Sequence, residues 1–160
     1  MTGSKLREVA RACACTNLRK AARVVTQLFD AALAPSGLKA TQFTLLVTSR
    51  LSGEATINRL AERMAMDRTT LSRNLKPLVR EGLLEVSPGG DGRTRLVRIT
   101  PEGERALDEA YPMWHAAQEE VVDALGKERY EALLGDVGRA VALATDGSPG
   151  SPKSARGGGA

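Results

Sequence analysis

Apolar residues recur at helical spacing along most of the chain, and capping residues, glycine or proline separate the apolar segments. The first segment predicts one long helix from Ser4 to about Leu33, with two apolar stripes that suggest burial on two sides. Two alternating segments, LLEVS and RLVRIT, flank the turn residues PGGDG and predict a β-hairpin. Further helices are predicted over residues 39–51, 56–64, 67–81, 101–125 and 127–145.

Capping residues and apolar faces define the ends and the buried sides of these helices. Thr56, Asp67 and Thr100 stand where helices are predicted to begin, and each has a side-chain oxygen that can accept a hydrogen bond from a free backbone N–H. Pro101 suits the first position of a helix. The residues expected to face the core are Phe43, Leu46, Val47, Leu51, Leu71, Leu75, Leu78 and Val79, with Leu107, Tyr111 and Trp114 on the long helix that follows.

The composition is that of an ordinary globular domain. Of 160 residues, 42% are apolar, 26% are charged and only 3% are aromatic, so the core depends on Leu, Val, Ala and Met. No apolar run reaches the ~18 residues that a membrane span needs, and the N-terminus lacks the apolar core of a signal peptide. We therefore expect a cytoplasmic protein without membrane contact. Residues 146–160 are rich in Gly, Ser and Pro and are expected to form a disordered tail.

The positive charge of the chain is concentrated in one segment. Residues 68–98 contain seven Lys and Arg residues but three Asp and Glu residues, an excess equal to the net charge of +4 of the whole chain. A localised basic patch indicates a polyanionic partner, although scattered solvated arginines would give the same count.

The middle of the chain predicts a winged helix-turn-helix, within a fold that is mainly α with a small β-hairpin wing. A helix fits the major groove of DNA, and an Arg-bearing hairpin tip can reach the neighbouring minor groove or its phosphates. The candidate DNA-binding residues are Arg68, Thr69, Thr70, Ser72, Arg73, Asn74, Lys76, Arg80, Asp91, Arg93 and Arg95. A winged-helix module that binds protein is the alternative.

These candidates have different expected roles. Three are expected to face the floor of the groove: Thr69, Ser72 and Arg73. Three suit contacts with phosphates: Arg68, Lys76 and Arg80. At the wing tip, Asp91 can hold the guanidinium of Arg93 extended, which reduces the entropy lost on binding.

Three blocks of the sequence, in order, resemble the MarR family of bacterial transcriptional regulators over about residues 7–144. They are ALAPSGLKATQFTLL, INRLAERMAMDRTTLSRNLKPLVREGLLEV and DGRTRLVRITPEG. The resemblance implies dimerisation helices at residues 1–34 and 101–145 and a winged helix-turn-helix DNA-binding region at 35–100. It also implies a homodimer on a palindromic operator, with a small ligand or an oxidant that changes the spacing of the two DNA-reading helices.

Apolar residues near both ends of the chain independently favour a dimer. One winged domain cannot cover the apolar faces that carry Leu6, Val9, Leu133, Val137 and Val141, unless these helices pack on their own subunit. A two-fold dimer would place two reading helices one helical turn of DNA apart, about 34–36 Å.

The resemblance places a small-molecule site in the cleft between the dimer helices and the winged region. Cys15, Arg19, Phe43 and Trp114 are candidates to line it, and an aromatic acid suits a cleft with Arg and aromatic rings. Core packing is the alternative for Trp114. The expected function is a repressor that such a ligand releases from DNA; activation remains open.

Cys13 and Cys15 lie on the first predicted helix. On a continuous helix, residues two apart diverge by about 200°, so the two thiols would point to opposite faces and a disulfide would need the helix to unwind. Each cysteine is either a small buried apolar residue or a redox-reactive group. The second role is implied by the resemblance, since some members of the MarR family have a reactive cysteine on the first helix.

Enzymatic and metal chemistry are not expected. The chain has one histidine, His115, and shows no Ser–His–Asp arrangement, no glycine-rich phosphate loop and no Cys/His cluster with metal-ligand spacing. We therefore expect a regulator that contains no cofactor.

Overall fold

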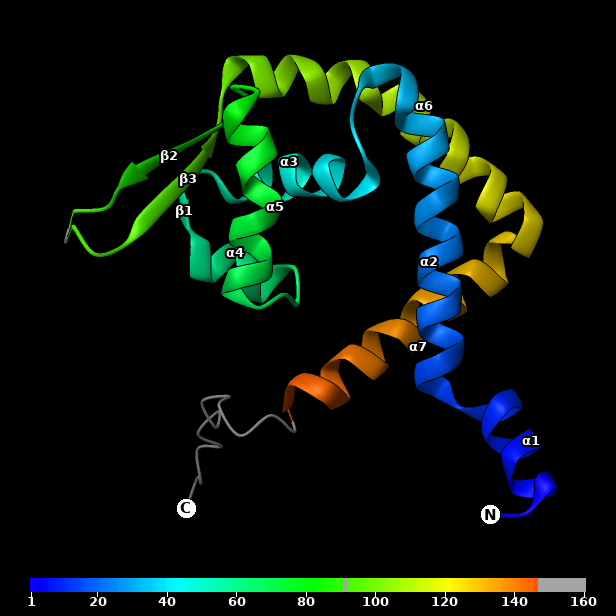
Figure 1. Ribbon diagram of the computed structural model, residues 1–160. Coiled ribbons are helices and arrows are strands. Elements are labelled where there is room, and N and C mark those ends of the chain that lie inside the picture. Colours follow the sequence, from blue (N-terminus) through cyan, green and yellow to red (C-terminus); the bar gives the residue numbers. More distant parts are fainter. Residues whose placement is uncertain (91, 147–160) are drawn as a thin grey trace, which may run out of the picture. The chain divides into compact units, whose positions relative to one another are not determined.

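The computed structural model describes residues 1–90 and 92–146, so residues 147–160 of the expected tail lie outside the described residues. Asp146, the first residue of the expected tail, is instead the last residue of helix α7. The fold is mainly helical with one small antiparallel sheet, which confirms the predicted fold class (Figure 1). Its elements are α1 (Gly3–Ala12), α2 (Ala14–Leu33), η1 (Ala34–Ser36), α3 (Ala40–Ser52), β1 (Ala55–Thr56), α4 (Ile57–Arg63), α5 (Arg68–Arg80), β2 (Leu84–Pro88), β3 (Arg95–Ile99), α6 (Pro101–Leu125) and α7 (Lys127–Asp146).

The first helix is interrupted, so the prediction of one continuous helix from Ser4 to Leu33 is wrong. At Cys13 the backbone is extended, with φ −66° and ψ 110°. The side-chain amide of Asn17 donates hydrogen bonds to the carbonyl oxygens of Arg11 (3.1 Å) and Cys13 (3.0 Å). The bond to Arg11 satisfies a carbonyl for which no backbone donor among the described residues is found at the break, because an amide side chain can replace a missing backbone N–H. The Cys13 carbonyl also accepts the backbone N–H of Asn17 at 3.1 Å.

The three predicted helix caps are confirmed. The Thr56 hydroxyl accepts a hydrogen bond from the backbone N–H of Arg59 at 3.2 Å, and Thr100 accepts one from Gly103 at 3.0 Å. Asp67 Oδ1 accepts the backbone N–H of Thr70 at 2.9 Å. Each bond satisfies a backbone donor that the first turn of a helix leaves free, and so fixes where α4, α6 and α5 begin.

The sheet has the strand order β1–β3–β2, and both pairs are antiparallel. Val97 in the central strand lies opposite Val86 in β2 and Ala55 in β1. The hairpin β2–β3 projects from the helical part (Figure 1). Strand β1 was not predicted, because its two residues are too few to show the alternation typical of a strand. It joins the start of α4 to the wing.

The core lies among α3, α4, α5 and the sheet. Its fully buried large apolar residues are Leu33, Leu45, Leu46, Leu60, Leu71, Leu78 and Val97. Leu51 and Val79 were expected in this core, but they are 79% and 38% exposed. Both stand near the C-terminal end of their helix, where the partner elements no longer cover the edge of the apolar stripe. Tyr111 is likewise exposed.

The chain forms two compact units, residues 1–117 and the part that begins at Gln118. The first unit contains the winged helix-turn-helix. In the second, the amide of Gln118 donates to the Tyr130 hydroxyl at 2.7 Å, which ties the end of α6 to α7. Leu133 and Val137 on α7 are exposed in the single chain.

Two serines on α3 are expected to affect the stability of the protein in opposite directions. Ser49 is fully buried, and its hydroxyl has no hydrogen-bond partner among the described residues. The Ser52 hydroxyl donates to the Thr48 carbonyl and accepts from Arg63, both at 2.6 Å. Since an unsatisfied buried hydroxyl is destabilising, S49A should raise the free energy of unfolding by about 1 kcal/mol, and S52A should lower it by a similar amount.

Denaturant unfolding of both variants beside the parent measures these changes. A loss of stability in S49A as large as that in S52A would show that the buried hydroxyl has a partner after all.

Candidate functional site

Helix α5 presents a polar, basic face because its leucines are buried on the opposite side. Leu71, Leu75 and Leu78 lie in the core, three and four residues apart. Arg68, Thr69, Arg73, Lys76 and Arg80 are exposed. Of the predicted DNA-binding residues on α5, these five and Thr70 are therefore accessible to a partner, while Ser72 and Asn74 are half-buried. The guanidinium of Arg80 lies 3.7 Å from the Glu81 carboxylate.

Two of the predicted residues already make hydrogen bonds within the protein. The Thr70 hydroxyl donates to Asp67 Oδ2 at 2.6 Å, and the Asn74 amide donates to the sulfur of Met66 at 3.7 Å. The hydroxyl and the backbone N–H of Thr70 also hold the pKa of Asp67 below its ordinary value. Asp67 therefore stays ionised and keeps the N-terminal turn of α5 fixed.

The wing carries the remaining predicted residues. Arg93 and Arg95 are exposed, and Arg95 is the first residue of β3. Asp91 lies outside the described residues, so the expected pairing of Asp91 with Arg93 stays a prediction. Arg98, nearer the base of the wing, forms an ion pair with Glu85 across the two strands at 3.0 Å.

Two hollows border the exposed face of α5. One, of about 150 Å³, lies between α4, α5 and the wing, and is lined by Thr56, Ile57, Asn58, Arg68, Arg93, Thr94 and Arg95. The other, of about 560 Å³, includes Lys39, Thr41, Arg73, Asn74 and Arg80. Sequence reasoning missed Asn58 and Lys39, because no local pattern says that the starts of α4 and α3 lie beside α5.

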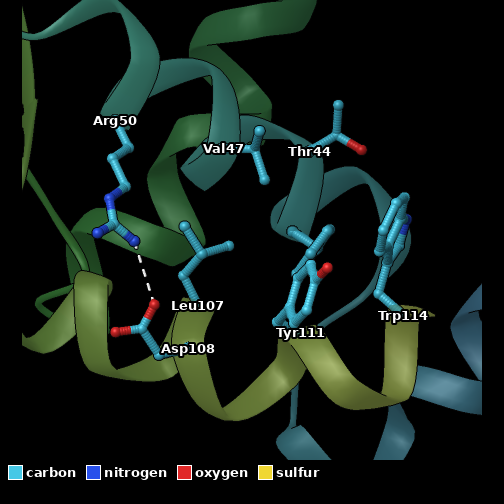
Figure 2. Close-up of a pocket in the computed structure, with 8 residues that line it drawn as sticks. Thr44, Val47, Arg50, Leu107, Asp108, Tyr111 and Trp114 are labelled. Atoms are coloured by element: carbon cyan, nitrogen blue, oxygen red, sulfur yellow. Dashed lines mark hydrogen bonds and ion pairs between the residues drawn. The ribbon is translucent and has the colours of Figure 1, made fainter. Parts of the chain in front are cut away.

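A separate, mainly apolar cavity of about 390 Å³ lies between α3 and α6. It is lined by Phe43, Thr44, Val47, Arg50, Leu107, Asp108, Tyr111 and Trp114. Figure 2 shows Arg50 and Asp108 together at one end and Tyr111 and Trp114 at the other. The Trp114 ring stacks on Phe43 at a centroid distance of 5.9 Å and an interplanar angle of 16°.

The cavity contains two of the four residues predicted to line a ligand site. Phe43 and Trp114 line it, whereas Cys15 and Arg19 do not. The positively charged side chain that lines the cavity is Arg50, whose guanidinium lies 3.1 Å from the carboxylate of Asp108. Sequence reasoning missed this pair, since its members are 58 positions apart.

The two cysteines lie at the break between α1 and α2. Cys13 precedes the first turn of α2 and is half-buried, and Cys15 is exposed within that turn. The hydroxyl and the backbone N–H of Thr16 lower the pKa of the Cys13 thiol. The two thiols therefore do not lie on opposite faces of one continuous helix, as the sequence predicted, because Cys13 is outside the helix.

The described residues include neither a helix that could span a membrane nor a cluster of metal-binding side chains. No helix there is long and apolar enough to cross a membrane. No group of three or more His, Cys, Asp or Glu side chains in the described part of the chain is placed to hold a metal ion.

Known proteins resemble the chain in both sequence and fold. Residues 36–94 match the model of the MarR family. A structure of the M. tuberculosis transcriptional regulator MosR in complex with DNA is 38% identical, with a TM-score of 0.78 over 84% of this chain and 97% of that chain. YwaE of Bacillus subtilis (strain 168), an uncharacterised HTH-type transcriptional regulator, is 28% identical over 75% of this chain and 71% of its own length.

The fold is also that of a more distant protein. A mutant of E. coli MarR complexed with operator DNA is 20% identical and superposes with a TM-score of 0.74, over 83% of this chain and 96% of that chain.

Proposed function

The chain belongs to the MarR family of DNA-binding transcriptional regulators, and from this premise we propose that it is a cytoplasmic, homodimeric repressor. It binds a palindromic operator, and a small aromatic acid releases it. The observation that carries the proposal is the basic face of α5 beside an Arg-bearing wing, with a mainly apolar cavity behind α3. The helix would occupy the major groove and the wing the neighbouring minor groove or its phosphates.

Exposed apolar side chains support the homodimer. Large apolar residues are exposed on α1 (Leu6, Val9), α2 (Leu18, Val24) and α7 (Leu133, Leu134, Val137, Val141). Soluble monomers rarely leave so many exposed on a few helices, because burying apolar area in a dimer is favourable. A second copy of the chain would cover them and present two α5 helices to one duplex.

The cavity between α3 and α6 supports a ligand response. An aromatic ring fits among Phe43, Tyr111 and Trp114, and a carboxylate could replace Asp108 as the partner of Arg50. The exchange costs little, because both side chains of the pair are largely exposed and such pairs contribute only about 0–1 kcal/mol. It would also break a link between α3, which supports the DNA-reading helix, and α6.

Two alanine variants test the DNA-binding roles. R73A removes a side chain expected on the groove floor, so it should cost about 1–3 kcal/mol of operator binding and relax base preference. R93A removes a wing contact, so it should weaken binding to all duplexes about equally and reduce the salt dependence. Titrations of fluorescent duplexes at several salt concentrations measure the affinity and the salt dependence of both variants. R105A, on α6, is the control for the loss of one positive charge. Parent-like affinity in both variants would refute the assignment.

The ligand site has an internal reporter, since Trp114 is the only tryptophan of the chain. Benzoate should change its fluorescence and release DNA, whereas neutral benzamide should bind more weakly. D108N leaves Arg50 without its competing partner, so it should bind benzoate roughly two- to fivefold more tightly. The neighbouring substitution E109Q is the control. Equal affinity of D108N and E109Q for benzoate would contradict the exchange of partners on Arg50.

The geometry at Cys13 supports a second candidate function, redox sensing. A thiol with a lowered pKa is deprotonated more often, and the thiolate is the form that peroxide oxidises. Cys13 also lies where α1 meets α2, so its oxidation would change a helix start within the expected dimerisation region.

Peroxide treatment separates this candidate from the first. If Cys13 is the sensor, peroxide should weaken operator binding by the parent and by C15S, but not by C13S, and a thiol reductant should restore it. Unchanged affinity of the treated parent would exclude the redox function and leave the ligand response untouched.

A further inference from the structure

The boundary between α5 and the wing has to meet the DNA backbone. Adjacent major and minor grooves are separated by one sugar–phosphate strand. A helix in one groove and a hairpin tip at the next therefore straddle that strand, whose phosphates must pass over the surface between them. In this protein that surface is the hollow of about 150 Å³ lined by α4, α5 and the wing.

Strand β1 builds this hollow. Its pairing with β3 places Thr56 opposite Leu96, so the start of α4 lies against the first residues of β3. Asn58, in the first turn of α4, and Arg95, at the start of β3, thereby come to line one hollow together with Arg68 of α5. Asn58 and Arg95 are 37 positions apart in sequence, and the pairing of β1 with β3 brings the elements that carry them together.

The chemistry of the hollow is that of an anion site. Three of its lining residues are arginines, and none of the described residues that line it is acidic. Asn58, Arg68 and Arg95 are exposed and make no hydrogen bond to another described residue, so their donors remain available. The Thr56 hydroxyl accepts the N–H of Arg59 and can still donate its own hydrogen.

We propose that this hollow holds one backbone phosphate of the DNA strand that separates the two grooves, with the Asn58 amide and the guanidinium groups of Arg68 and Arg95 as its donors. The inference rests on the proposed DNA-binding function and adds Asn58 to its residues. Arginine suits a phosphate because its N–H groups form charge-assisted bonds in a fixed planar geometry. A phosphate held by α4, α5 and β3 at once would fix the reading helix and the wing in one register, without reading sequence.

The test uses a duplex that the full-length parent selects from a random library, so that no operator has to be known beforehand. N58A should weaken binding roughly tenfold at every sequence, because it removes a neutral donor to a charged group, and should leave the salt slope unchanged. N58D should bind far more weakly than N58A, since it places a negative charge beside the phosphate. R95A should lower the salt slope by about one, whereas R105A, a charge-matched control on α6, should not.

Neutral methylphosphonates, placed one at a time along the strand, locate the contact. One position per half-site should be costly for the parent and clearly less costly for N58A and R95A, because each of these variants has already lost that contact. An equal cost in parent and variants at every position would overturn the phosphate site. The proposed function would survive that result, since the parent would still bind the selected duplex.

A free anion as the natural occupant is the remaining outcome. If inorganic phosphate displaced DNA from the parent more strongly than chloride of equal ionic strength, N58A abolished this difference, and no methylphosphonate position were coupled to N58A, the hollow would be an effector site and the backbone proposal would be wrong. A methylphosphonate position that is coupled to N58A and R95A is the expected result.

Discussion

Burial of one face of α5 is the constraint on which the proposed DNA-binding surface depends. Leu71, Leu75 and Leu78 pack in the core with α3 and the sheet, and burying each leucine is worth about 1.5–3 kcal/mol. These contacts fix how α5 is rotated about its axis. The basic face must then point outward, so Arg68, Arg73 and their neighbours need no individual interaction to orient them.

The wing and α6 are fixed to the same core by a compact joint. The Thr100 hydroxyl donates to the carbonyl of Gly82 at 2.7 Å, and its backbone N–H donates to the carbonyl of Leu83 at 3.1 Å. Gly103 follows in the first turn of α6, where any side chain would overlap the Leu83 carbonyl oxygen. The close approach of α6 to the segment between α5 and β2 therefore requires glycine. In this way α6 leaves the wing in a defined direction and forms one wall of the cavity.

Local hydrogen-bonding rules explain why much of this fold could be predicted from the sequence. The caps at Asp67 and Thr100 and the limits of α6 depend on neighbouring residues alone. The helical spacing within α5 is likewise enough to predict its leucine stripe and its basic face. The break at Cys13 could not be predicted, because no glycine or proline marks it and the Asn17 amide sustains it. A strand of two residues, β1, is too short to show alternation. The ion pair between Arg50 and Asp108 and the proximity of Asn58 to Arg95 depend on tertiary packing. The spacing of these residues along the sequence does not predict either contact.

The proposed function requires one arrangement, in which two copies of the chain each place α5 in a major groove and a wing beside the adjacent minor groove of one duplex. Hydroxyl-radical footprinting of the parent on a selected duplex, with the protein-to-DNA ratio of the complex measured by sedimentation, tests it most directly. We expect two protomers per duplex and two symmetric protected regions, whose centres lie about 10 base pairs apart or a multiple of that spacing. A single protected region occupied by one protomer would contradict it.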